Sequence, residues 1–204
     1  MNVITLGTAE MDEAVDVLCD AFGDYPVMRF VIGQVDDVYA ARLRSLVAFF
    51  TAARFLNGDV VWGVRADDGE LAAVANITPP GERPRSGELE VRRAALWRDL
   101  GEPSRERYES IGRIWQRFVL ERPHYHLNMI GVRRSFQGQG VARLLLDALH
   151  EQSASAADSC GVSLSTEVPI NVRLYEHFGY EVTGYARVSS DLETWSFFRP
   201  NAAR

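Results

Sequence analysis

The segment Leu127–Ala142, which reads LNMIGVRRSFQGQGVA, constrains the fold more than any other part of the chain. Its apolar run through Val132 predicts a buried strand, and apolar residues recur with helical spacing from Val141 onward. Gly138 and Gly140 lie between the two, where glycine lets the backbone approach a ligand closely. The unpaired N–H groups and the dipole of the following helix then favour an anion at this turn.

The spacing of the glycines narrows the kind of anion. A dinucleotide-binding turn needs a third glycine where this chain has Arg143, and a Walker loop needs lysine, of which the chain has none. What remains is Gln137-x-x-Gly140-x-Ala142. This spacing resembles the Gln/Arg-x-x-Gly-x-Gly/Ala pyrophosphate motif of the GNAT superfamily of acetyl-CoA-dependent N-acetyltransferases.

Residues 162–184 resemble the second half of the same signature, a strand followed by a helix of the form Asn-x-x-x-Tyr-x-x-x-Gly-Tyr/Phe. Asn171 and Tyr175 are four residues apart and so share one helix face. Pro169 suits the helix start, and Gly179 suits a left-handed cap at its end. The resemblance implies that Asn171 meets the pantetheine arm and that the Tyr175 hydroxyl lies near the CoA sulfur.

The resemblance also implies the fold and the rest of the CoA site. The expected fold is α/β of the GNAT type, a mixed, mostly antiparallel sheet of about seven strands that splays at strand four, with helices on both faces. Residues 1–204 would form one domain, with a helical insertion at 82–122 on the substrate side. A backbone N–H near Ile130 would polarise the thioester carbonyl. The other expected CoA-binding residues are Val132, Gln137, Gly138, Gln139, Gly140, Val141 and Ala142.

Within the superfamily the pattern is closest to puromycin N-acetyltransferase-like members. The likeness rests on Ala21–Pro26, on Gly131-Val132, and on Thr194-Trp195 followed by Arg199-Pro200. Strand five departs from that pattern, because the acid of its Leu-Glu-Thr-Ser order stands two residues later here, at Glu167. Glycine tolerates a kink, so we expect Gly131 to form a bulge that separates strands four and five.

Tyr175 is the expected general acid, since a departing thiolate needs a nearby proton donor, although an isolated tyrosine on such a helix is usually a core residue. His124 and His126 alternate onto one strand face with Asn128, and either could be the base, because histidine titrates near neutral pH. Asp24 and Glu167 are the next candidates for the base, although Asp24 could cap the local backbone and Glu167 could simply line the cleft.

Composition excludes several other classes. The net charge of −6 and the isoelectric point of about 5.3 argue against nucleic acid as a main partner and fit a cationic substrate better. Cys19 and Cys160 have no metal-ligand spacing, so we expect no metal and a reducing, cytoplasmic location. The first residues have neither a basic region nor a long apolar core, so neither secretion nor a membrane span is expected.

The sequence therefore predicts transfer of acetyl from acetyl-CoA to a primary amine of a small molecule, by direct attack in a ternary complex. A competing class is a non-catalytic acyl-CoA-binding domain that acts as a sensor or interaction module. A third reading, acetylation of a protein N-terminus or lysine, is weaker because the 82–122 insertion should narrow the cleft. The sequence leaves open whether the chain forms a homodimer.

Overall fold

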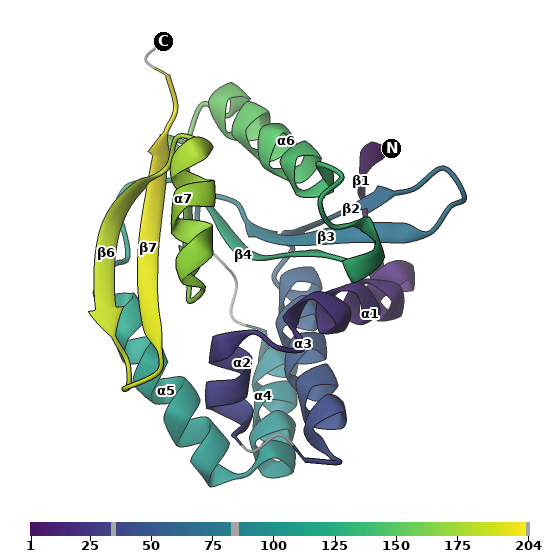
Figure 1. The fold of residues 1–204 in the computed structure, drawn as a ribbon, viewed down its shortest axis with the longest axis vertical. Helices are drawn as coiled ribbons and strands as arrows, with labels where there is room; N and C mark the ends of the chain where they lie inside the picture. The colour runs from purple at the N-terminus through teal and green to yellow at the C-terminus, as the bar shows by residue number, and fades with distance from the viewer. Residues whose placement is uncertain (34–35, 83–85, 203–204) are drawn as a thin grey trace.

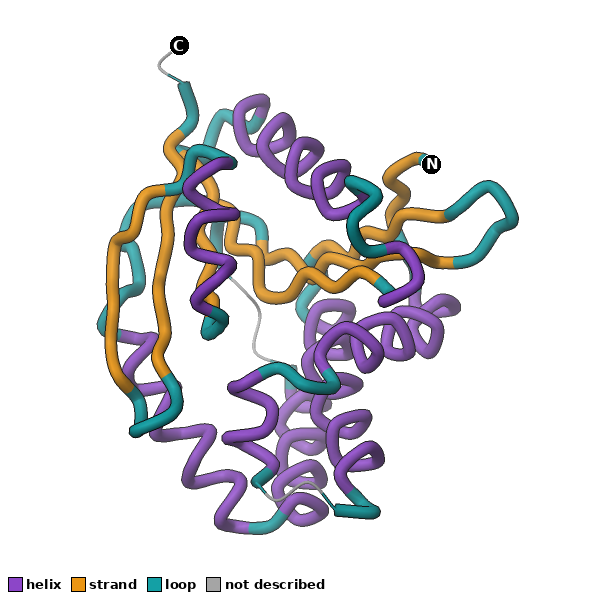
Figure 2. Tube along the Cα trace, in the orientation of Figure 1, coloured by secondary structure: helices purple, strands orange, loops and turns teal. Residues whose placement is uncertain are grey.

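The computed structural model describes residues 1–33, 36–82 and 86–202 and is built on one seven-stranded sheet (Figures 1 and 2). The strands are β1 Asn2–Thr5, β2 Val60–Arg65, β3 Leu71–Thr78, β4 Tyr125–Val132, β5 Gly161–Thr166, β6 Glu181–Arg187 and β7 Glu193–Pro200. Their order is β1-β2-β3-β4-β5-β7-β6, and only β4 and β5 pair in parallel. The mixed, mostly antiparallel sheet predicted from the sequence is confirmed.

Helices cover both faces of the sheet (Figure 1). They are α1 Met11–Phe22, α2 Pro26–Ile32, α3 Tyr39–Leu56, α4 Gly87–Leu100, α5 Glu102–Gln116, α6 Val141–Ser155 and α7 Pro169–His177, with short 3-10 helices η1 Thr8–Glu10 and η2 Arg134–Phe136. Val74 of β3 packs with the α1–α3 core, whereas Ala73 and Ala75 pack with the α6 core, as the two-residue period of a strand requires. Among the described residues, no helix combines the length and hydropathy needed to cross a membrane.

The sheet splays between β4 and β5. The two strands pair only over Tyr125–Leu127 and Val162–Leu164, although β4 continues to Val132 and β5 to Thr166. Beyond Leu127 the two strands diverge, and the β5 side of β4 no longer has a partner strand. This separation at strand four was predicted and is confirmed.

The bulge in β4 lies at Asn128, so the prediction of a bulge at Gly131 is wrong. Met129 pairs with Asn76 of β3 and Leu127 pairs with the next residue, which leaves Asn128 as the extra residue. Gly131 keeps regular pairing, and glycine is needed there for another reason. A Cβ on Gly131 would lie 2.9 Å from the Ala21 Cβ, so the missing side chain makes room for α1.

Helices α4 and α5 fall within the predicted 82–122 insertion, of which residues 83–85 lie outside the described part. They pack on α2 and α3. The chain after α5 then reaches the far edge of the sheet, where the ring of Phe118 occupies the space that a Cβ on Gly184 of β6 would need. The segment therefore reaches from the helices α2 and α3 to the edge strand β6.

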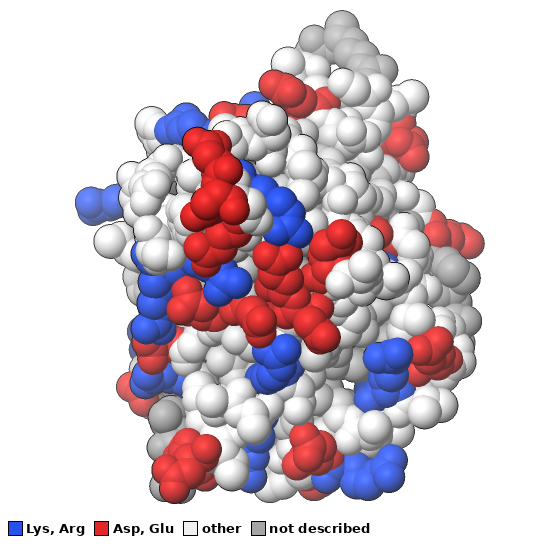
Figure 3. Space-filling model, turned by 90° about the vertical axis from the view of Figure 1, so that its right-hand side faces the viewer, with Lys and Arg blue, Asp and Glu red and all other residues white. Residues whose placement is uncertain are grey.

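Charged side chains are interleaved on the face that carries α1 (Figure 3). Arg44 of α3 pairs with Asp12 and Asp16 of α1, and Arg65 of β2 pairs with Glu13 at 2.8 Å. Exposed pairs of this kind contribute little to stability. They do offset the negative charges of Asp12, Glu13 and Asp16 on α1.

Candidate active site

A cleft of about 500 Å³ opens where β4 and β5 separate. It continues between the sheet and the helices α1, α2, α3 and α5. Six of the predicted site residues line it, namely His124, His126, Ile130, Glu167, Asn171 and Tyr175. Val132 and residues 137–142 do not line the cleft. Val132 ends β4, and residues 137–142 form the glycine turn and the first two residues of α6.

The glycine turn before α6 has the geometry of an anion site. Gly138 and Gly140 have φ values of +76° and +78°, and a Cβ on either would meet no protein atom within 4 Å. Gly140 caps α6 without any side-chain hydrogen bond, so the first-turn N–H groups of Val141 and Ala142 have no cap. An open turn beside an uncapped helix end suits a bound anion.

The side chains of the turn hold its shape. Gln137 donates to the carbonyl of Val132 at 3.1 Å, and Gln139 donates to that of Ser135 at 3.0 Å. Both amides therefore bond within the turn.

Asp24 anchors this turn and does not face the cleft. Its carboxylate pairs with Arg29 and with Arg134, which precedes the turn, and its side chain is 69% exposed. The Arg29 guanidinium lowers the pKa of Asp24 below its usual value. Asp20 of α1 also accepts the backbone N–H of Arg134 at 2.7 Å. An exposed, ion-paired carboxylate outside the cleft is a poor base, so we set Asp24 aside.

Tyr175 is buried with its ring against Tyr180 and Phe197, at centroid distances of 5.7 and 5.6 Å. Within the described residues its hydroxyl makes no hydrogen bond, and the residue lines the cleft. Burial, together with the charge of Glu167, raises the pKa of Tyr175 to about 12. The phenol is therefore protonated at neutral pH and can donate.

Asn171 lies one helical turn before Tyr175 and is held in place by Thr166. Its Nδ2 donates to the Thr166 Oγ1 at 3.2 Å, and the same oxygen lies 3.0 Å from the hydroxyl of Tyr25. The Tyr25 hydroxyl also accepts the backbone N–H of Glu167 at 3.2 Å. No local motif marks Tyr25 or Thr166 as functional. Tyr25 lies between α1 and α2 and Thr166 ends β5, so the two residues meet only in the folded chain.

Glu167 is a buried carboxylate in the cleft, only 6% exposed. Its Oε1 accepts hydrogen bonds from the Trp115 Nε1 at 3.3 Å and from the Thr194 Oγ1 at 2.7 Å. Desolvation raises the pKa of Glu167, and these hydrogen bonds offset part of the shift. A carboxylate that is costly to ionise and lies in a cleft is a candidate for proton transfer.

The two histidines differ in their surroundings. The Nδ1 of His126 lies 2.8 Å from the Ser163 Oγ, and burial, with smaller effects from the charges of His124 and Arg54, lowers the pKa of His126 to about 4. Its imidazole is thus neutral at pH 7. The Nδ1 of His124 donates to the carbonyl of Arg122 at 2.6 Å, which fixes its tautomer.

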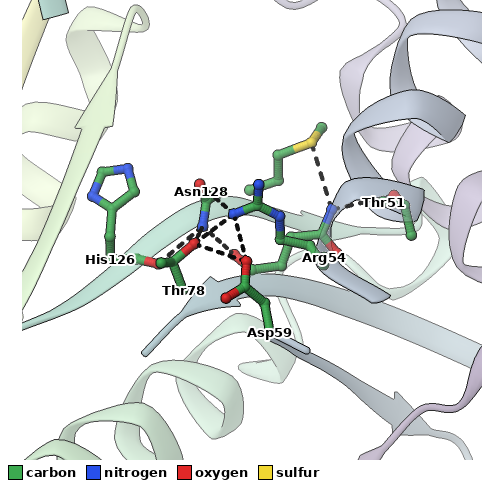
Figure 4. Close-up of polar contacts among 8 residues, drawn as sticks. Thr51, Arg54, Asp59, Thr78, His126 and Asn128 are labelled. Atoms are coloured by element: carbon green, nitrogen blue, oxygen red, sulfur yellow. Dashed lines mark hydrogen bonds and ion pairs between the residues drawn. The ribbon is translucent and has the colours of Figure 1, made fainter. Parts of the chain in front are cut away.

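A polar cluster beside His126 fixes the β4 bulge (Figure 4). The Arg54 Nη1 lies 2.5 Å from the Thr78 Oγ1, 3.1 Å from the Asn128 Oδ1 and 3.2 Å from the Asp59 Oδ2. Asn128 also donates to Thr78 at 2.9 Å. Arg54 lines the cleft, and no local motif marked it, because its partners come from three other segments.

No group of three or more His, Cys, Asp or Glu side chains that could hold a metal ion occurs in the residues the structure describes. Cys19 and Cys160 are both free. Burial raises the pKa of Cys19 to about 11, and neither cysteine lines the cleft. A thiol with that pKa is a poor nucleophile near neutral pH.

Residues 105–182 match the family model described as an acetyltransferase (GNAT) domain. This range contains the glycine turn, Asn171 and Tyr175. A probable serine/threonine-protein kinase from Dictyostelium discoideum is 27% identical over 158 residues, which cover 70% of this chain. The match spans only 17% of the kinase.

Solved structures share the fold over the whole chain. A histone acetyltransferase HPA2 and related acetyltransferase from Corynebacterium glutamicum superposes with a TM-score of 0.72, at 21% identity, over 100% of this chain and 97% of that one. A polyamine N-acetyltransferase from Drosophila melanogaster, which forms N-acetylagmatine, gives 0.60 at 13% identity, over 98% and 100%. The chain therefore has the GNAT fold, and its residues 105–182 match the GNAT acetyltransferase domain.

Proposed function

We propose that this chain is an N-acetyltransferase that moves acetyl from acetyl-CoA to a primary amine of a small molecule by direct attack in a ternary complex. The observation that carries the proposal is the position of Tyr175. Its protonated hydroxyl, without a hydrogen-bond partner among the described residues, lines the cleft at the splay of the sheet. A leaving thiolate needs such a donor.

Acetyl-CoA supplies an activated acetyl thioester when bound. The family resemblance assigns its pyrophosphate to the backbone of residues 137–142, its pantetheine arm to Asn171 and its thioester carbonyl to the N–H near Ile130. The open φ-positive turn and the unpaired β5 side of β4 support these assignments. Holding both reactants in one cleft provides much of the acceleration.

The proton balance of the step uses two residues of the chain. The amine nitrogen forms a bond to the acetyl carbon while the carbon–sulfur bond breaks. Tyr175 gives its proton to the sulfur, and Glu167 takes one from the amine. We choose Glu167 over His126 because burial raises the pKa of Glu167 and makes its carboxylate a better proton acceptor, whereas burial lowers the pKa of His126 to about 4 and makes its imidazole a weaker one.

Glu167→Gln is expected to lower kcat by about 10²- to 10⁴-fold and to remove the acidic limb of its pH profile. Glutamine keeps a side-chain oxygen for Trp115 and Thr194 but cannot take the proton.

The same variant also has an expected effect on stability. Because the folded state raises the pKa of Glu167, the burial of its carboxylate destabilises the protein as pH rises above 4.5. The variant should therefore melt at a higher temperature than the parent at pH 7, and the difference should vanish below about pH 4.5.

His126→Gln is the matched control for this prediction. Its imidazole is neutral throughout the working range, so the acidic limb of kcat should keep its position. If His126→Gln removes the limb and Glu167→Gln keeps it, the base is His126. If neither change alters the profile, His124 or a water relay is left to carry the proton.

Free thiol release from acetyl-CoA, measured with a panel of amines that includes puromycin and other aminonucleosides, tests the function directly. We expect release that depends on the amine. Binding of CoA without release would favour the non-catalytic acyl-CoA-binding module instead. Release only with peptides that carry a free N-terminus or lysine would replace the small-molecule acceptor with a protein.

We also propose a reducing, cytoplasmic setting for the protein. The two free cysteines are consistent with it.

A further inference from the structure

The cleft runs from one core of the protein to the other. Tyr175 and Ile130 belong with the α6 core, on the side of the glycine turn. Most of the other apolar side chains that line the cleft belong with the α1–α3 core, and Phe118 belongs to neither core. We call this second part the acceptor arm and define it by the apolar side chains Phe22, Met28, Phe50, Tyr108, Trp115 and Phe118. They come from α1, α2, α3, α5 and the segment after α5.

The acceptor arm is held at two places. Trp115 donates through Nε1 to the Glu167 Oε1 and to the Thr194 Oγ1, at 3.3 and 3.2 Å. Phe118 fills the space left by the missing side chain of Gly184. The ring centroids of Phe50 and Tyr108 lie 5.8 Å apart. These contacts within the chain fix the walls of the acceptor arm.

The charges around the cleft are asymmetric. Of the described residues that line it, Glu167 is the single carboxylate, and it lies at the junction of the acceptor arm with Tyr175. Arg54 is on the wall, paired with Asp59, and His126 is neutral. Among the described residues, the cleft therefore offers one carboxylate with which an ammonium group can pair.

We infer that the acceptor is a monoamine whose apolar body fills the acceptor arm, and that diamines and polyamines are excluded. The inference rests on the proposed function and names its substrate class. A second ammonium would have to leave water and face aromatic rings and the Arg54 guanidinium. Cation–π attraction recovers only part of such a desolvation cost. The apolar body gains from burial against the same rings.

The test compares n-hexylamine with 1,6-diaminohexane, which match in chain length and differ by one terminal amine. We expect kcat/KM for n-hexylamine to be at least about 100-fold higher, because the second charge is buried without a partner. 2-Phenylethylamine should behave like n-hexylamine, and agmatine like the diamine. Thiol release is the readout for all four amines.

Phe50→Asp places a second carboxylate in the cleft, within the acceptor arm. It should reduce the ratio of kcat/KM for n-hexylamine to kcat/KM for 1,6-diaminohexane at least about tenfold, because the diamine gains a partner for its distal charge. Phe50→Leu, which stays apolar, should keep the ratio. If Phe50→Asp does not fold, the ratio in the parent protein still decides. Equal or better turnover of the diamine by the parent protein overturns the inference and leaves the acetyltransferase intact. Thiol release with none of these amines and with none of the aminonucleosides of the panel overturns both.

Discussion

Tyr175→Phe is expected to lower kcat by about 10²- to 10⁴-fold at saturating acetyl-CoA, while the affinity for CoA stays nearly unchanged. Phenylalanine keeps the ring that packs on Tyr180 and Phe197 and deletes only the hydroxyl. Because the pKa of Tyr175 is about 12, the donor is protonated throughout the working range, and no basic limb should come from it below about pH 11. Steady-state kinetics and calorimetry measure the two quantities.

Tyr180→Phe is the matched control for the loss of a buried tyrosine hydroxyl. Tyr180 lies next to Tyr175, but its hydroxyl bonds to the His150 Nε2 at 2.9 Å and it is not among the cleft-lining residues. Its removal should affect stability and leave kcat close to that of the parent. The loss in Tyr175→Phe should also shrink with a donor whose thiol leaves more easily. Full activity of Tyr175→Phe would reduce Tyr175 to a packing residue and assign the proton to water.

Gly140→Val is expected to weaken CoA binding at least about 100-fold, since each hydrogen bond to a charged group contributes about 1.5–3 kcal/mol and the branched side chain displaces more than one of them. Gly140 has φ of +78° and its Cβ would project into open space at the helix start, where we place the phosphates. Isothermal titration with CoA measures the affinity, and circular dichroism reports the fold.

A backbone with positive φ is strained by any β-branched residue, so the strain needs its own control. Gly58 has φ of +67°, no atom within 4 Å of its Cβ position, and a location in the turn between α3 and β2. Gly58→Val should match the loss of stability in Gly140→Val and bind CoA normally. Equal CoA affinity in both valine variants would place the pyrophosphate elsewhere.

Local sequence patterns predicted the parts of the fold that are themselves local. The strand, glycine turn and helix of 127–142 and the helix that carries Asn171 and Tyr175 lie where their periodicity and turn residues put them. Helix α2 was missed, because seven residues that begin at Pro26 are too few for a period to stand out.

Long-range contacts account for what the sequence did not indicate. Arg54 meets Thr78 of β3 and Asn128 of β4 only after these two strands have paired, and these contacts accompany the bulge at Asn128. The ion pair that sets Asp24 aside as a base is also a long-range contact, because its partner Arg134 lies 110 residues away. Pairing partners of this kind leave no signal in the spacing of nearby residues.

Transfer of a labelled acetyl group tests the central claim most directly. Acetyl-CoA carrying ¹³C in its acetyl group is incubated with the protein and n-hexylamine, and free thiol is measured while mass spectrometry follows the label. The account predicts one labelled N-acetyl amide for each thiol released, with both products falling together in Tyr175→Phe. Tight binding of CoA with the label retained in the thioester, across the whole amine panel, would contradict it.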